Sequence, residues 1–127
     1  MKYNKTNIIA LLLPLSFLAF VGISTFVVPV PKEVFYFYIA ISVFLFVVYG
    51  VDKNAARNGS RRISESNLHL IALAGGWPGA LFAQQYFRHK TQKKPFLIPF
   101  WITVVLNGAF FIWLITPEGL IYLSEFI

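Results

Sequence analysis

The sequence predicts an all-α integral membrane protein with three transmembrane helices and a broken re-entrant or interfacial helical hairpin. Of its 127 residues, 57% are hydrophobic and only 13% are charged, whereas roughly 25% of a soluble domain is charged. So little polar surface cannot cover a body this small in water. Three uncharged runs have the length of a bilayer crossing, and the basic residues gather in two short strips around a fourth, interrupted apolar segment.

The first predicted span covers residues 8–28, which carry no charge. At 1.5 Å per residue this run is about 30 Å long, the thickness of a hydrocarbon core. Pro14 lies inside it, as a kink that a membrane helix tolerates. A cleaved signal peptide is the rival interpretation, because Lys2 and Lys5 precede the run. The run is too long for a typical signal-peptide core, so we expect the helix to be retained.

Two further spans follow after a turn. Two prolines within residues 27–33 prevent one helix from continuing into the next. Residues 34–51 form the second uncharged span, and residues 96–115 form the third, with Asn107 inside it. The only charged residues of the tail, residues 116–127, are acids. We expect most aromatic side chains, including those of Tyr36, Tyr38 and Tyr49 near the ends of the second span, to face lipid or to form interfacial belts.

Residues 67–87 form the ambiguous element. Gly-Gly-Trp-Pro-Gly at 75–79 separates two apolar halves, 67–74 and 80–87. Each half makes about 12 Å of helix, which is too short to span, and Pro78 suits the first turn of the second half. The alternative is one unbroken fourth span, because small residues recur on one helical face and would allow close packing. These small residues are Ala72, Gly76, Gly79 and Ala83.

Charge distribution chooses between these topologies. If residues 67–87 cross the bilayer, six basic residues lie inside and five outside, which is almost no bias. If the segment returns to its own side, only Lys32 lies outside and the acidic tail joins it there. The positive-inside rule favours this return, with the N-terminus in the cytoplasm. The basic residues then inside are Lys2, Lys5, Lys53, Arg57, Arg61, Arg62, Arg88, Lys90, Lys93 and Lys94.

The two polar strips, residues 52–66 and 88–94, are the candidate site. Asp52 ends a predicted membrane helix, where the helix dipole disfavours an acid, so a nearby cation must compensate. One interpretation is an ion-paired basic basin that binds a phosphate-bearing ligand; the other is topogenic charge with structural salt bridges. The predicted anion ligands are Arg57, Arg62, Arg88 and Lys90, and the predicted orienting or ion-pairing residues are Asp52, Lys53, Glu65 and His89.

Other chemistry has weaker support. Glu65 and His69 are four residues apart and could ligate a metal together with His89, but no metal motif surrounds them, so we expect no metal and no cofactor. The chain has no cysteine, which excludes disulfides and thiolate sites. We expect the uncharged polar residues Gln84, Gln85 and Asn107 to form hydrogen bonds between helices rather than line a pore.

Several motifs occur in an order typical of one family. They are Asp52-Lys53-x-x-Ala56, Arg62-Ile63-Ser64-Glu65, Leu68, Gly75-Gly76-x-x-Gly79, Arg88-His89-Lys90-Thr91, Lys94 and Phe96. The chain thus resembles the small bacterial membrane proteins designated domain of unknown function 1294. The resemblance covers residues 49–113, departs at Ser64, where the family commonly has proline, and leaves residues 1–33 as an added helix and turn.

The resemblance carries no established activity. It marks seven residues as the most informative ones: Asp52, Lys53, Arg62, Glu65, Arg88, His89 and Lys90. Some relatives are joined to a cold-shock domain, which implies that the basic strips face the cytoplasm.

We therefore expect residues 1–127 to form a single membrane domain that binds anionic lipid headgroups, or a partner, through its cytoplasmic basic strips. We expect a homo-oligomer or a membrane-protein partner rather than nucleic acid. Two other hypotheses stay open: a membrane enzyme acting on a lipid or phosphorylated substrate, with His89 or His69 as acid or base, and an oligomeric channel or transporter subunit.

Overall fold

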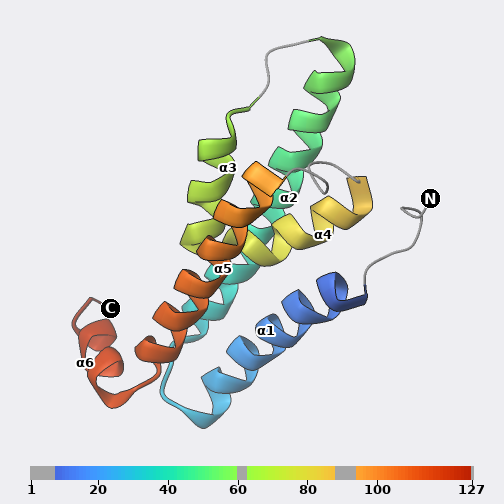
Figure 1. The fold of residues 1–127 in the computed structure, drawn as a ribbon. Coiled ribbons are helices and arrows are strands. Elements are labelled where there is room, and N and C mark those ends of the chain that lie inside the picture. The colour runs from blue at the N-terminus through green and yellow to red at the C-terminus, as the bar shows by residue number, and fades with distance from the viewer. Residues whose placement is uncertain (1–7, 60–62, 88–93, 127) are drawn as a thin grey trace.

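The computed structural model describes residues 8–59, 63–87 and 94–126, and this part of the chain contains helices and no strand (Figure 1). Three of its helices are long and apolar enough to cross a membrane: α1, α2 and residues Leu97–Leu114 of α5. The all-helical class is thus confirmed, and the apolar helices are those of a membrane protein. The elements are α1 (Ile8–Val27), α2 (Lys32–Asn58), α3 (Glu65–Ile71), the π-helical η1 (Ala72–Gly76), α4 (Trp77–Phe87), α5 (Lys94–Leu114) and α6 (Pro117–Phe126).

The helix α2 is longer than the uncharged run that predicts it. It continues through residues 52–58 to Asn58 and ends at Gly59, whose φ of 69° is left-handed and whose N–H donates to the carbonyl of Ala55. Alanine, lysine and arginine in this stretch favour helix, so charge marks where the apolar part of α2 ends and not where the helix ends. The left-handed end suits glycine, which has no Cβ to clash.

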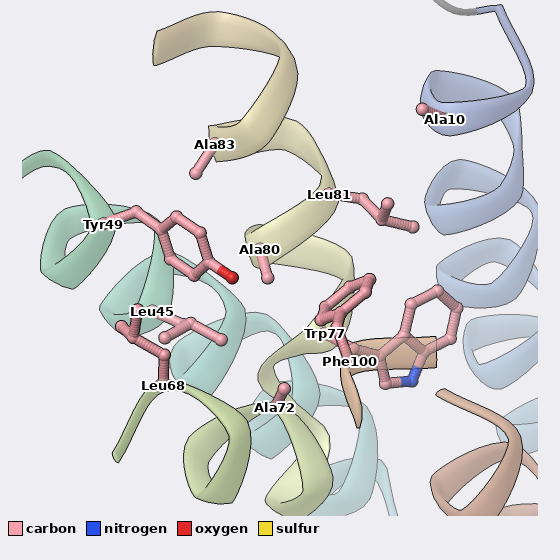
Figure 2. Packing of buried hydrophobic residues seen from close by; sticks show 10 residues of the cluster. All are labelled: Ala10, Leu45, Tyr49, Leu68, Ala72, Trp77, Ala80, Leu81, Ala83 and Phe100. Atoms are coloured by element: carbon pink, nitrogen blue, oxygen red, sulfur yellow. The ribbon is translucent and has the colours of Figure 1, made fainter. Parts of the chain in front are cut away.

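The helices pack around α2. Figure 1 shows α2 running opposite to both α1 and α5. One buried cluster joins α2 to α4 and includes Leu45, Tyr49, Trp77 and Leu81, which come together from two elements in Figure 2. A second cluster joins the other ends of α1, α2 and α5, with Phe111 at its centre. The core therefore extends along the whole of α2.

Residues 63–87, here called the bent segment, contain α3, η1 and α4. The Ser64 side chain caps α3 near the start of the segment by accepting from the Asn67 N–H at 3.2 Å. The break falls in η1, where Gly75 has a φ of 127°. Pro78 lies in the first turn of α4, as predicted. The small residues on the shared face are all buried, so the break and the close packing occur together: Ala72, Gly76, Gly79 and Ala83.

The bent segment runs along α2 and comes back. At its start, the Ile63 N–H donates to Asp52 Oδ1 at 3.0 Å. At its middle, a Cβ on Gly75 would lie 3.1 Å from the Tyr38 ring. At its end, the Phe87 carbonyl accepts from Lys53 Nζ. Since residues 38–52 span about 21 Å of helix, the segment travels that far along α2 and returns to its starting level.

The C-terminal helix α6 lies within residues 116–127, for which the sequence predicts only an acidic tail. Pro117 occupies the first helical position, and the Gly119 N–H donates to Thr116 Oγ1 at 3.2 Å, which caps the helix. Gly119 also packs against the backbone of Leu114 at the end of α5. The Thr-Pro-Glu sequence is a helix-start signal, so α6 has a recognisable cause in the sequence.

Candidate functional site

Asn107 of α5 forms a buried polar junction at the bend. Its Oδ1 accepts from Tyr38 Oη at 3.0 Å and from Trp77 Nε1 at 3.1 Å, and its Nδ2 donates to the Leu73 carbonyl at 2.9 Å. One amide thus joins α2, η1, α4 and α5. Because a π-helical break frees backbone groups that lipid cannot satisfy, the bond to Leu73 stabilises the break directly.

Gln84 forms a second buried contact between helices, donating from Nε2 to Tyr49 Oη at 3.3 Å. Asn107 and Gln84 therefore bond between helices, as predicted. The expectation for Tyr38 and Tyr49 is wrong: they are 4% and 0% exposed and lie in the core instead of a belt. Their phenols find amide partners in the interior, which a burial pattern in the sequence could not reveal.

Asp52 holds the start of the bent segment. Its side chain is fully buried, and its Oδ1 accepts the Ile63 backbone N–H. The prediction that Asp52 ends a membrane helix is wrong, because α2 continues for six more residues to Asn58. The helix dipole therefore does not create the need for a compensating cation, and the carboxylate meets a backbone donor.

Lys53 holds the other end of the same segment. Its Nζ donates to the Phe87 carbonyl, at the C-terminus of α4, and lies 5.9 Å from the centre of the Phe87 ring. A cation at a helix C-terminus is favourable, because the last carbonyls lack helical partners. Two adjacent residues, one acid and one base, thus fasten both ends of the bent segment to one turn of α2.

The other predicted site residues divide into two groups. Arg57 is exposed in the last turn of α2, and Glu65 is half-buried in the first turn of α3. The remaining predicted residues lie outside the described residues: Arg62, Arg88, His89 and Lys90.

The described parts of the chain contain no group of three or more metal-ligating side chains. Glu65 and His69 lie on α3, whereas His89, their predicted third companion, falls outside residues 63–87 and 94–126. Among the described residues, the site consists of Asp52 and Lys53, which fasten the bent segment to α2, and of Arg57 in the last turn of α2.

Trp77 and Tyr38 are members of the buried junction that the sequence did not single out. The Gly-Gly-Trp-Pro-Gly run was described only as the separator of two apolar halves, yet Trp77 is 2% exposed and bonded to Asn107. A single indole placed among glycines at a helix break was the available signal, because a buried indole N–H needs an acceptor. A lone amide in the apolar run 96–115 was the matching signal.

Comparison with known proteins supports the resemblance drawn from the motifs. Residues 42–96 match the family described as "Protein of unknown function (DUF1294)". These residues include the second half of α2 and the whole bent segment. The expected resemblance to this family is confirmed.

A relative from Bacillus subtilis (strain 168), the "Uncharacterized protein YsdA", is 45% identical over 51 residues. That alignment covers 40% of this chain and 57% of the relative, so the two share only part of their lengths. No solved structure matches the chain.

Proposed function

We propose that this membrane protein binds anionic phospholipid headgroups at the end of α2 where the bent segment begins and ends. One observation carries the proposal: Asp52 and Lys53, adjacent on α2, bond to Ile63 and Phe87 at opposite ends of the bent segment. In the sequence, Arg62 directly precedes Ile63 and Arg88 directly follows Phe87. Arg62 and Arg88 are therefore each adjacent in sequence to a residue that is fastened to the same turn of α2.

The topology that supports this proposal has three spans and one return. Helices α3 and α4 contain 7 and 11 residues, or about 10 and 16 Å of helix, and neither reaches across a hydrocarbon core of about 30 Å. We infer that the bent segment enters and leaves the membrane on the cytoplasmic face of a bacterial inner membrane. With the N-terminus on that face, the positive-inside rule is satisfied.

The chemistry of the strips suits phosphate. Arginine offers planar, bidentate donors to phosphate oxygens, and each basic residue near an anionic leaflet contributes about 1 kcal/mol of attraction. Asp52 is buried beneath this surface and accepts a backbone N–H, while Arg57 is exposed at the end of α2. Arg62, Arg88 and Lys90 supply further charge from the two strips.

Cysteine labelling tests the topology, since the chain contains no native cysteine. Ser60→Cys and Gln92→Cys should react with a membrane-impermeant maleimide from the same side of sealed vesicles. Glu118→Cys in α6 is the control for the opposite side. If positions 60 and 92 react from different sides, the bent segment spans the membrane and the shared headgroup site is wrong.

Lipid retention tests the binding. In nanodiscs that mix phosphatidylglycerol with phosphatidylcholine, native mass spectrometry of the released protein should find phosphatidylglycerol enriched. The double variant Arg62→Gln/Arg88→Gln should lose that enrichment. The matched control, Lys2→Gln/Lys5→Gln, removes two charges expected on the same face and should keep it. Equal enrichment in both variants would contradict a headgroup site and leave the strips to topology or to a protein partner.

A further inference from the structure

A cavity of about 270 Å³ lies at the other end of the bundle, away from Asp52 and Lys53. It is an open groove lined by the first turns of α2, the bend at η1, the second half of α5, and α6. Its floor contains the buried side chains of Tyr38 and Asn107, and Ala74, which precedes Gly75, lines its exposed side. The cavity therefore reaches from the end of the bundle to the break in the bent segment.

The walls of the cavity are apolar and partly aromatic. The rings of Phe37 and Phe110 line it from α2 and α5, and Leu123 closes it from α6. A pocket of this kind binds the apolar body of a ligand, and a few polar groups select its orientation. Aromatic faces also attract organic cations through the negative face of the ring.

The polar side chains at the floor of the cavity already have hydrogen-bond partners within the protein. Tyr38 Oη and Trp77 Nε1 already donate to Asn107 Oδ1, and Asn107 Nδ2 already donates to Leu73. A polar ligand group placed there would compete with bonds that hold four elements together. The polar end of a ligand must therefore lie toward the mouth.

Among the described lining residues, Glu33 is the one with a carboxylate side chain. It lies exposed in the first turn of α2. Its neighbour Lys32 lines a separate groove between α1 and α2 and is not part of this lining. The mouth thus carries a negative charge above an aromatic and aliphatic interior.

We propose that this cavity binds an amphipathic organic cation, with the ammonium group beside Glu33 and the apolar body between Phe37, Phe110 and Leu123. The carboxylate pairs with the positive charge, and the rings add cation–π attraction near a low-dielectric boundary. The proposal is independent of the headgroup site, because it uses the opposite end of α2 and no residue of the basic strips.

Isothermal titration of the purified, detergent-solubilised protein with benzyltrimethylammonium tests the proposal. The protein should bind this cation, and it should not bind 3-phenylpropanoate, which carries the opposite charge on a similar body. Glu33→Gln should weaken binding of the cation at least tenfold, and Glu33→Asp should restore most of it. Leu123→Trp fills the cavity and should abolish binding.

Glu118→Gln is the matched control, because it removes an exposed acid from α6 outside the cavity lining. It should leave the affinity within twofold of the original protein. Thermal unfolding of every variant confirms that the fold is retained. The proposal is overturned if benzyltrimethylammonium fails to bind, if Glu33→Gln binds it as well as the original protein, or if native mass spectrometry finds the cavity held by a lipid that Leu123→Trp displaces.

Discussion

The first helix and the bent segment contain similar numbers of residues and are built in opposite ways. Helix α1 is continuous over 20 residues, and its most apolar stretch of 18 residues has a mean hydropathy of 2.3 and is only 22% buried. Large side chains such as Ile9 and Phe26 project outward, 71% and 82% exposed. In the bent segment, every residue from 75 to 81 is buried, and four of the seven are glycine or proline.

This difference follows from what surrounds each segment. A helix that faces lipid must satisfy its own backbone, because lipid offers no hydrogen bonds. A helix may break inside a membrane protein where other helices enclose the break and supply partners. Asn107 supplies such a partner to Leu73, and α2 approaches closely because glycine faces it. High hydropathy thus marks contact with lipid, and small residues mark contact with protein.

The largest expected effect is that of Gly79→Ala. A Cβ on Gly79 would lie 2.8 Å from the Cα of Ser42 and closer still to its carbonyl group, so α2 and α4 would have to separate. We expect a loss of about 3 kcal/mol or more in the free energy of unfolding, at the upper end for overpacking. Thermal unfolding in detergent and the yield of monodisperse protein measure it.

Gly108→Ala is the control for that prediction. Gly108 lies within α5, and a Cβ there meets nothing within 4 Å. Alanine favours helix by about 1 kcal/mol over glycine, so this variant should be as stable as the original protein or more so. If both variants behave alike, close packing of α2 on the bent segment does not distinguish it from a lipid-facing span.

Removing the amide of Asn107 should have the next largest effect. Asn107→Ala leaves Trp77 Nε1, Tyr38 Oη and the Leu73 carbonyl without their partner. Each unsatisfied buried group costs about 1 to 3 kcal/mol, while hydrogen bonds in membrane proteins average about 0.6 kcal/mol. We expect a net loss of about 2 to 3 kcal/mol by thermal unfolding. Asn54→Ala, at an exposed position of α2, should cost almost nothing; an equal loss would refute the special role of the junction.

Substituting the two glycines with positive φ distinguishes the cost of backbone strain from the cost of steric crowding. Gly75 has a φ of 127°, and a Cβ there would meet the Tyr38 ring at 3.1 Å; Gly59 has a φ of 69° and open space around it. Backbone strain of this kind costs about 1 to 3 kcal/mol. In a urea titration of detergent-solubilised protein, Gly75→Ala should lose about 2 kcal/mol and Gly59→Ala about 1 kcal/mol. The reverse order would mean that the bend tolerates side chains.

The apolar spans and the start of α4 near Pro78 could be predicted, because hydropathy and the preference of proline for a first helical turn act locally. The length of α2 beyond residue 51 could not be predicted from charge alone, since helix propensity continued past the apolar run. The partners of Asn107 were beyond reach, because they come from residues 34 and 69 positions away and depend on tertiary packing.

For the candidate site, the sequence predicted which residues belong to it but not what each one bonds to. Asp52 and Lys53 were singled out from the motifs, but their roles were not, because a sequence does not show which backbone group a side chain will reach. Asp52 was expected to end a helix, but α2 continues past it, and its carboxylate accepts the Ile63 N–H. Lys53 was grouped with the ion-pairing residues, and its bond to the Phe87 carbonyl depends on where α4 returns to α2.

The smallest expected effect concerns that return. Lys53→Met keeps the aliphatic stem but removes the charge and the donor to the Phe87 carbonyl, an interaction at a helix C-terminus that contributes about 0.5 to 1 kcal/mol. Because the loss is local, hydrogen exchange should quicken in the last turn of α4 with little change around Trp77. Lys32→Met, at the exposed start of α2, should leave exchange in α4 unchanged. Uniformly faster exchange in Lys53→Met would mean that Lys53 supports the whole bundle, and unchanged exchange would mean that the contacts of Phe87 with Gly50 and Phe46 hold the end of α4 without it.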